Sequence, residues 1–245
     1  MRSPVSHAGS RAATPELSIV IPVGPNDESW HGLLSWLEPL DLVHEVIFSA
    51  CQPPPADLSV LAGNSRANRN RARWLTGKAG RARQLNLGVQ RARANTVWLL
   101  HADCRPELDA LRAAERFVRA DSGTLGWFDL AFDPDGPGLT RWNARGANLR
   151  SRLLGLPFGD QGWIIETGLI EEIGGFDEQF GPGEDLDFVV RARAAGVGLQ
   201  ALGATLNTSA RRFADHGWLE TTGTHLWLTL KLWIKSKNKP GTLRK

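Results

Sequence analysis

Short runs of apolar, largely β-branched residues recur along the first half of the chain and alternate with segments of helical periodicity. Such nearly continuous runs are typical of strands buried on both faces of a parallel sheet. The clearest are Leu17–Val23, Val43–Ser49 and Thr96–Leu100. Helical patterns cover 26–37, 80–94 and 106–120, the last with a proline at its start. This alternation predicts an α/β fold, a mostly parallel open sheet with helices on both faces.

The second half of the chain is less regular, but its elements can still be assigned. We expect strands near 58–62, 124–132 and 197–206, helices at 139–154, 184–195 and 218–233, and a glycine-rich turn at 155–162. A length of 245 residues suits one domain. We assign residues 1–16 to a flexible tail, 17–236 to the domain and 237–245 to a basic tail.

Composition and charge exclude several classes of protein. Hydrophobic residues make up 42% of the chain, as in globular proteins. Lysine and arginine outnumber the acids by only 29 to 26, so the chain is not a polycation of the histone type. Two cysteines, Cys51 and Cys104, are too few for a disulfide scaffold and indicate a reducing, cytoplasmic location. No apolar run reaches the roughly eighteen residues of a membrane-spanning helix.

An acid-free, arginine-rich stretch extends from Leu58 to Ala102 and contains nine basic residues. One interpretation is a basic helix face in solvent, partly paired with acids elsewhere. Arg81 and Arg83 support a sharper hypothesis, because they follow Gly80 at the expected start of a helix. The free N–H groups of a helix N-terminus favour anions, and guanidinium groups match phosphate oxygens. The pattern therefore indicates a phosphate site.

Asp103 directly follows the expected strand at 96–100. Ligands of open α/β sheets bind at the carboxyl ends of the strands, where a carboxylate can hold a divalent cation against a diphosphate. The alternative is that Asp103 caps the helix that begins near Pro106, and capping does not exclude metal binding.

A second concentration of acids lies at the expected start of the helix at 184–195. Glu184, Asp185 and Asp187 are three acids within four residues. They complement the helix dipole, and Asp187 can pair with Arg191 one turn later. Three acids exceed what capping requires, so one of them is a candidate general base.

These segments together resemble a known family. The pattern GGFDE…GEDLDFVVRARAAG, which begins at Gly174, is similar to a segment of glycosyltransferase family 2, inverting enzymes of the GT-A fold. The block GRARQLNLGVQRARANTVWLLHADCRP at 80–106 resembles one branch, the rSAM/selenodomain-associated transferases. FGDQG at 158–162 and SARRF at 209–213 fit the same branch. The resemblance covers about residues 17–230.

The resemblance implies transfer of a sugar, with inversion, from a nucleotide-diphosphate sugar to an acceptor hydroxyl. It implies Asp185 as general base with Glu184 beside it, and Mg²⁺ or Mn²⁺ at Asp103, with His101 in place of the first acid of the family's metal motif. The donor-binding positions that it implies are Pro22, Glu28, Arg81, Gln84, Asn86 and Asp103. On the acceptor side it implies Gly159, Asp160 and Gln161. Trp163, which follows that loop, is a candidate for stacking on a sugar, although burial in the core is the simpler interpretation.

The chain departs from the family pattern in two places. The segment from Pro22 to Glu28 is at least one residue longer than the family's PxxNE element. The second strand ends in SACQPPP, where relatives carry a VDGGSTD-like stretch whose aspartate contacts the nucleotide base. Because no acid is present there, the resemblance does not identify the nucleotide.

Three other functions compete with sugar transfer. A nucleotidyltransferase would use the same metal position, but Gly24-Pro25 is a poor glycine-rich nucleotide loop. A degenerate transferase would bind the nucleotide sugar without turnover. Nucleic-acid binding through 66–93 is disfavoured, because Trp74 is the single aromatic residue there.

The final segment also has two interpretations. Residues 218–245 place tryptophans and leucines at helical spacing before a lysine-rich end. This composition suits peripheral contact with the inner face of a plasma membrane. The acceptor stays open between a lipid-linked molecule and a small molecule. A last helix packed on the domain, followed by a solvated basic tail, is the simpler alternative.

Overall fold

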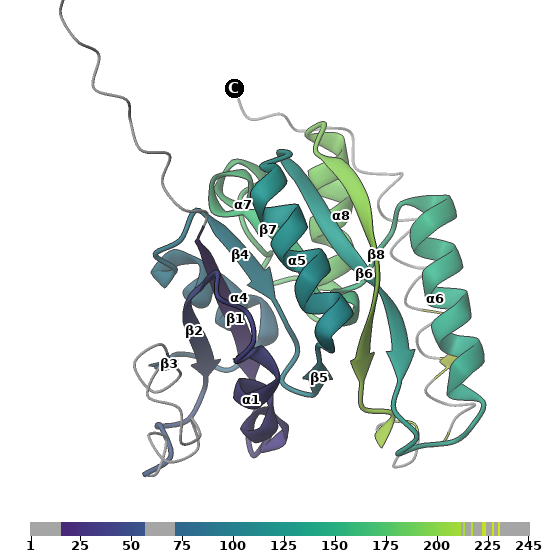
Figure 1. Ribbon diagram of the computed structural model, residues 1–245, viewed down its shortest axis with the longest axis horizontal. Helices are drawn as coiled ribbons and strands as arrows, with labels where there is room; N and C mark the ends of the chain where they lie inside the picture. The colour runs from purple at the N-terminus through teal and green to yellow at the C-terminus, as the bar shows by residue number, and fades with distance from the viewer. Residues whose placement is uncertain are drawn as a thin grey trace, which may run out of the picture.

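The computed structural model describes residues 16–56 and 72–211, together with residues 213, 217, 222, 223, 227 and 230. In these parts the chain forms one open eight-stranded sheet with helices on both faces (Figure 1). The strands are β1 Leu17–Val23, β2 Val43–Ala50, β3 Ala72–Thr76, β4 Thr96–Leu99, β5 Cys104–Arg105, β6 Thr124–Phe132, β7 Trp163–Glu166 and β8 Gly198–Thr208. The α-helices are α1 Leu33–Leu37, α4 Arg81–Arg91, α5 Leu108–Ala120, α6 Thr140–Leu154, α7 Thr167–Ile173 and α8 Glu184–Ala194. Two short 3₁₀ helices, η1 Ser29–Gly32 and η2 Gly159–Gln161, complete the set.

The strand order is β3-β2-β1-β4-β7-β6-β8-β5. Strands β1 to β4 are mutually parallel, and β6 and β8 run in the same direction as they do. Among the described strands, β7 and β5 run the opposite way. The predicted fold class is therefore confirmed, and six carboxyl ends share one edge of the sheet, the edge at which ligands of such sheets bind.

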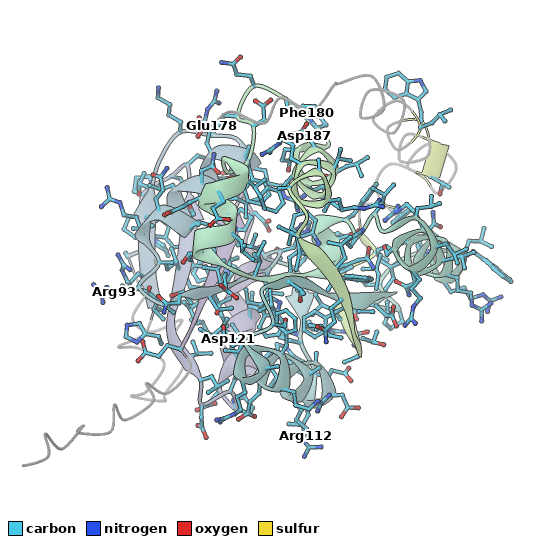
Figure 2. The ribbon with its side chains drawn as sticks, turned by 90° about the horizontal axis from the view of Figure 1, so that it is seen from above. Arg93, Arg112, Asp121, Glu178, Phe180 and Asp187 are labelled. Carbon is cyan, nitrogen blue, oxygen red and sulfur yellow. The ribbon has the colours of Figure 1, made fainter. Side chains whose placement is uncertain are left out.

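Side chains that alternate along β1 divide the core into two layers. Ile19 and Ile21 pack with residues of α1 and α5, whereas Val20 packs with residues of α4 and α8 on the opposite face. All three are fully buried, which explains why β1 reads as one continuous apolar run. Figure 2 shows the two layers, with Asp187 of α8 on one side of the sheet and Arg112 of α5 on the other.

The expected helix at 26–37 is shorter than its sequence pattern. Asn26 has a positive φ of 58°, which places it in a left-handed turn outside any right-handed helix. The Asp27 carboxylate then accepts a hydrogen bond of 3.0 Å from the Ser29 N–H. Helical structure begins only at Ser29, as η1 followed by α1. The apolar periodicity was a correct guide to burial but not to the length of the helix.

Other differences concern short elements. The sequence analysis did not predict β3, β5, β7 or α7, which contain two to seven residues each. The expected strand at 58–62 lies outside the described residues. So do the tail at 237–245, all but Glu16 of the tail at 1–16, and most of the helix at 218–233, of which residues 222, 223, 227 and 230 are described and helical.

Candidate active site

A pocket at the carboxyl edge of the sheet brings together side chains from segments far apart in the sequence. Its polar lining comes from Arg81, His101, Gly159 and Asp185. Leu85, Leu99, Leu100, Trp163 and Phe176 form its apolar lining. The structure thus gathers at one place four of the predicted polar site residues.

Arg81 occupies the first turn of α4, next to the free N–H groups of the helix. Its guanidinium contacts the His101 ring at Nε2, and its Nε lies 3.3 Å from Glu184 Oε1. Gly80, with φ of 126°, adopts a backbone conformation open to glycine, and this directs the chain into the helix. A cation and a helix N-terminus therefore face the same pocket, an arrangement suited to phosphate.

Asp185 lies in the first turn of α8 and is almost completely buried. Its Oδ2 accepts a hydrogen bond of 3.0 Å from the Gly159 N–H, and its Oδ1 accepts one of 2.8 Å from the Leu186 N–H. A Cβ at position 159 would collide with the Arg81 guanidinium, so a larger residue here would displace the Arg81 side chain from its present position. Burial raises the pKa of the neighbouring Glu184, an effect that Arg81 partly offsets.

Asp160 is the most perturbed carboxyl group of the site. Burial raises its pKa to about 6, against the attraction of Arg150 and with a further contribution from the charge of Asp185. Its Oδ1 is buried and has no hydrogen-bond partner among the described residues. A pKa near neutrality and an uncommitted oxygen are the properties of a group that can exchange a proton at physiological pH.

Asp103 lies beside the pocket, just after β4. Its Oδ1 accepts a hydrogen bond of 3.2 Å from the Thr208 hydroxyl, and burial raises its pKa, partly offset by Thr208 and Arg211. Asp27 also acts on Asp103 electrostatically, and Asp27 Oδ1 is 3.1 Å from an Arg211 nitrogen. Hydrogen bonds from Ser29 and the pairing with Arg211 outweigh burial and lower the pKa of Asp27.

The donor set at Asp103 fits a divalent cation that retains most of its water. No group of three or more His, Cys, Asp or Glu side chains forms a ready cage in the described part of the chain. Mg²⁺ is commonly held by one or two protein carboxylates together with phosphate oxygens of the ligand. Asp103, with Asp27 nearby, could provide the carboxylates. His101 does not fit as a ligand in this arrangement, because its Nε2 contacts the Arg81 cation.

Two residues of the predicted acceptor side are buried in the structure. Gln161 is completely buried, and its amide binds Ser151 Oγ at 2.6 Å and the Phe128 carbonyl at 3.1 Å. Trp163 is 1% exposed and stacks on Phe176 and Phe188 within the core, so it offers no open ring face to a sugar. Both residues shape the loop and floor of the site without being accessible to an acceptor.

Two predicted donor contacts prove to hold the backbone. Gln84 is buried and donates from Nε2 to the Val23 carbonyl at 2.5 Å, which ties α4 to the end of β1. Asn86 accepts from the Phe176 N–H at 2.8 Å and donates to the Phe176 carbonyl at 2.9 Å. These amides therefore position the donor edge of the pocket.

Pro22 lies within β1 and Glu28 is exposed just before η1, and neither belongs to the pocket lining. The residues that the sequence analysis missed are Asp27, Arg211 and Arg150. Arg211 lies in the SARRF segment, which carried a family signal but no role.

Within the SACQPPP segment, Gln52 forms hydrogen bonds with other parts of the chain. The Gln52 carbonyl accepts from Trp74 Nε1 at 3.0 Å, and the Gln52 side chain accepts from the Asn26 N–H at 3.3 Å. This glutamine links the segments that follow β1 and β2 to Trp74 of β3.

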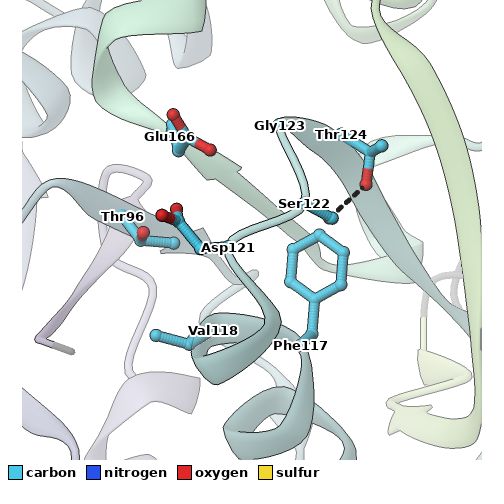
Figure 3. Close-up of a pocket in the computed structure, with 8 residues that line it drawn as sticks. All are labelled: Thr96, Phe117, Val118, Asp121, Ser122, Gly123, Thr124 and Glu166. Atoms are coloured by element: carbon cyan, nitrogen blue, oxygen red, sulfur yellow. Dashed lines mark hydrogen bonds between the residues drawn. The ribbon is translucent and has the colours of Figure 1, made fainter.

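A second pocket lies at the opposite edge of the sheet, at the start of β4 and β6 (Figure 3). Asp121 and Glu166 line it, and Ser122 Oγ lies 2.8 Å from Thr124 Oγ1. None of the predicted site residues contributes to it, and it is at the amino ends of the parallel strands. The carboxyl-edge pocket is therefore the candidate active site.

Comparison with known proteins identifies the fold. No family model matches the sequence, and no curated protein matches it. Among solved structures, the mannosyltransferase PcManGT from Pyrobaculum calidifontis, in complex with GDP-Man and Mn²⁺, is similar with a TM-score of 0.69 and 16% identity, over 98% of this chain and 69% of that one. S. aureus TarS 1–349 has a TM-score of 0.59 and 15% identity over 79% of this chain. The structure of S. aureus TarS has a TM-score of 0.60 and 16% identity over 80% of this chain.

The chain has the fold of these glycosyltransferases. It spans 60% of the length of TarS 1–349 and 37% of that of TarS. None of the helices in the described ranges is long and apolar enough to cross a membrane.

Proposed function

We propose that the protein is an inverting glycosyltransferase of the family 2 type, which moves a sugar from a nucleotide-diphosphate sugar to an acceptor hydroxyl. The observation that carries this proposal is the carboxyl-edge pocket. There Arg81 at a helix N-terminus lies with Asp185, and the charges of both act on the adjoining Asp160, within the fold of known glycosyltransferases. The GDP-Man and Mn²⁺ in the mannosyltransferase neighbour support a nucleotide-sugar donor and a divalent metal.

In this proposal the diphosphate of the donor binds at the start of α4. The Arg81 guanidinium and the free N–H groups of that helix stabilise the negative charge that develops on the leaving group. Asp103 holds Mg²⁺ or Mn²⁺, which supplies Lewis-acid neutralisation of the same charge. Gln84 and Asn86 fix the position of α4 relative to β1 and to the segment around Phe176.

Asp185 is the proposed general base. A sugar hydroxyl is a weak nucleophile, so a carboxylate that takes its proton as the bond forms contributes roughly 10²- to 10⁴-fold. The Gly159 N–H fixes one oxygen of Asp185, and the neighbouring Asp160 keeps negative charge concentrated at this side of the pocket. Inversion at the sugar carbon requires that the acceptor attack from the face opposite the departing diphosphate.

The test compares two aspartates of the same helix. With GDP-, UDP- and dTDP-sugars, Mn²⁺ and a panel of acceptors, Asp185→Asn should lower turnover by about 10²-fold or more, because it removes the proton acceptor. Asp187→Asn is the control, since Asp187 pairs with Arg191 at 2.8 Å and is not part of the pocket lining.

Three results would count against the proposal. Equal turnover in Asp185→Asn and the unmodified protein would remove Asp185 as base. Thermal stabilisation by a nucleotide sugar without transfer to any acceptor or to water would identify a binding protein instead. Release of diphosphate from a nucleoside triphosphate would identify a nucleotidyltransferase.

A further inference from the structure

The outer face of α6 carries an exposed apolar stripe, which we call the α6 face: Trp142, Leu149 and Leu153. Their spacing of seven and four residues puts them on one side of the helix. They are 54%, 58% and 72% exposed, respectively. The opposite side of α6, including Ala144 and Ser151, is buried against the domain. Isolated exposed leucines are ordinary, but three large apolar side chains in line on one helix form an interaction surface.

Arginines flank this stripe. The Arg145 guanidinium lies 4.8 Å from the centre of the Trp142 ring, and that of Arg141 lies 5.9 Å from it. In the parts of the chain that the structure describes, neither arginine forms an ion pair, whereas Arg152 pairs with Asp129 at 2.5 Å. Two cations with long apolar stems therefore border the exposed tryptophan, an arrangement that can keep the charges in water while the ring inserts into an apolar layer.

The charge pattern extends beyond α6. Residues 136–159 contain four arginines and no acid, and residues 221–245 contain six lysines and arginines and no acid. At Thr222 the second segment contacts the first, because Asn143 Nδ2 donates to Thr222 Oγ1 at 2.9 Å. Together they hold ten of the 29 basic residues and none of the 26 acids, which leaves 19 basic and 26 acidic residues in the rest of the chain. A chain of net charge +3 is thus strongly polarised.

We propose that the α6 face docks on the surface of an anionic lipid bilayer. Tryptophan and leucine enter the boundary between headgroups and acyl chains, and arginines at its border contact lipid phosphates. Each basic residue near an anionic membrane contributes about 1 kcal/mol of attraction, which corresponds to about fivefold in binding. A second copy of the chain is the poorer occupant, because it would set two acid-free basic segments against two others.

This surface is connected to the candidate active site through α6 itself. From the buried side, Ser151 binds Gln161, and the Arg150 guanidinium lies 3.5 Å from the centre of the Phe158 ring. Docking of α6 therefore brings the loop at 158–161 close to the membrane. One further step rests on the proposed function. If the protein transfers sugars, the acceptor hydroxyl belongs to a membrane lipid or a lipid-linked molecule.

The test is co-sedimentation of the full chain with vesicles of phosphatidylcholine alone and of equal parts phosphatidylcholine and phosphatidylglycerol. The unmodified protein should bind the anionic vesicles at least about tenfold more tightly. The double variant Leu149→Ser, Leu153→Ser should lose about tenfold or more of that binding. Its control is Leu108→Ser, a leucine 51% exposed on α5, which should bind like the unmodified protein.

The charge contribution is tested in parallel. Arg141→Gln with Arg145→Gln should weaken anionic binding by about tenfold or more, whereas Arg112→Gln with Arg116→Gln on α5 should not. Three outcomes would overturn the proposal: no binding of the unmodified protein, equal binding to both vesicles, or a stable dimer that the leucine variant converts to monomers. Binding requires no donor, so a protein that binds vesicles but transfers no sugar would contradict the proposed function alone.

Discussion

The two sides of the candidate active site are built differently. On the α4 side, polar side chains are committed to backbone groups, as Gln84 is to Val23 and Asn86 is to Phe176. On the α8 side, carboxyl groups are buried, and nearby arginines offset the cost of burying their charge only in part. Burial therefore raises the pKa of both Asp160 and Glu184. The first side resembles a scaffold and the second resembles a reactive centre. The difference indicates that geometry is fixed on the α4 side, where the proposed function places the donor, and protonation is adjustable on the α8 side, where it places the acceptor.

Arg81 is the exception on the α4 side, because its cation faces the pocket, and it gives the largest expected effect. Arg81→Gln should lower kcat/KM for the nucleotide sugar by roughly 10²- to 10³-fold, since it removes the positive charge opposite the leaving group. Steady-state kinetics at saturating Mn²⁺ would measure this loss. Arg83→Gln is the matched control, because Arg83 pairs with exposed Glu178 at 3.5 Å. Equal losses in the two variants would show that α4 acts through its overall charge and not through a built phosphate site.

Asp160 gives the next largest effect, on stability as a function of pH. Its pKa is about 6 in the folded protein against an ordinary value of 3.8, so the folded protein retains a proton that the unfolded chain releases between these values. Asp160 therefore lowers the free energy of unfolding as pH rises from about 4 to 6, and the loss persists above that window. Asn at position 160 in the variant Asp160→Asn cannot ionise. The free energy of unfolding of the variant should therefore rise, relative to that of the unmodified protein, by up to about 3 kcal/mol across the window.

Urea unfolding at several pH values between 4 and 7 would measure this change. A flat difference for Asp160→Asn would show that Arg150 neutralises the buried carboxylate fully, and the contrast between the two sides of the site would lose its main support.

Much of the scaffold side could be predicted from the sequence. Continuous apolar runs specified β1, β2 and β4 because both faces of these strands are buried. A glycine followed by arginines indicated the start of α4, where the structure places it. Motif order also predicted that Arg81 and Asp185 belong to one site, and the pocket brings them together.

The remainder depends on contacts that no local pattern encodes. Arg211 pairs with Asp27 across 184 residues, and Arg150 acts on Asp160 from a helix that carries no motif. Trp163 and Gln161 lie in motif positions, yet packing against Phe188 and hydrogen bonds within the loop bury them. A motif indicates that a residue matters near the site, but burial decides whether it contacts a ligand or positions one that does.

Asn86 offers the smallest effect and tests the scaffold side directly. Asn86→Ala removes both hydrogen bonds to the Phe176 backbone, and leaves that N–H and carbonyl to find water in a half-buried place. The free energy of unfolding should fall by about 2 kcal/mol, seen as a lower urea midpoint at an unchanged slope. Asn86→Asp keeps the acceptor for the Phe176 N–H but loses the donor, and it sets a second carboxylate against Glu178. Because the two carboxylates repel each other, its loss of stability should not be intermediate between the unmodified protein and Asn86→Ala. If Asn86→Ala changed kcat and left stability untouched, Asn86 would contact the donor, and the α4 side would be chemical as well as structural.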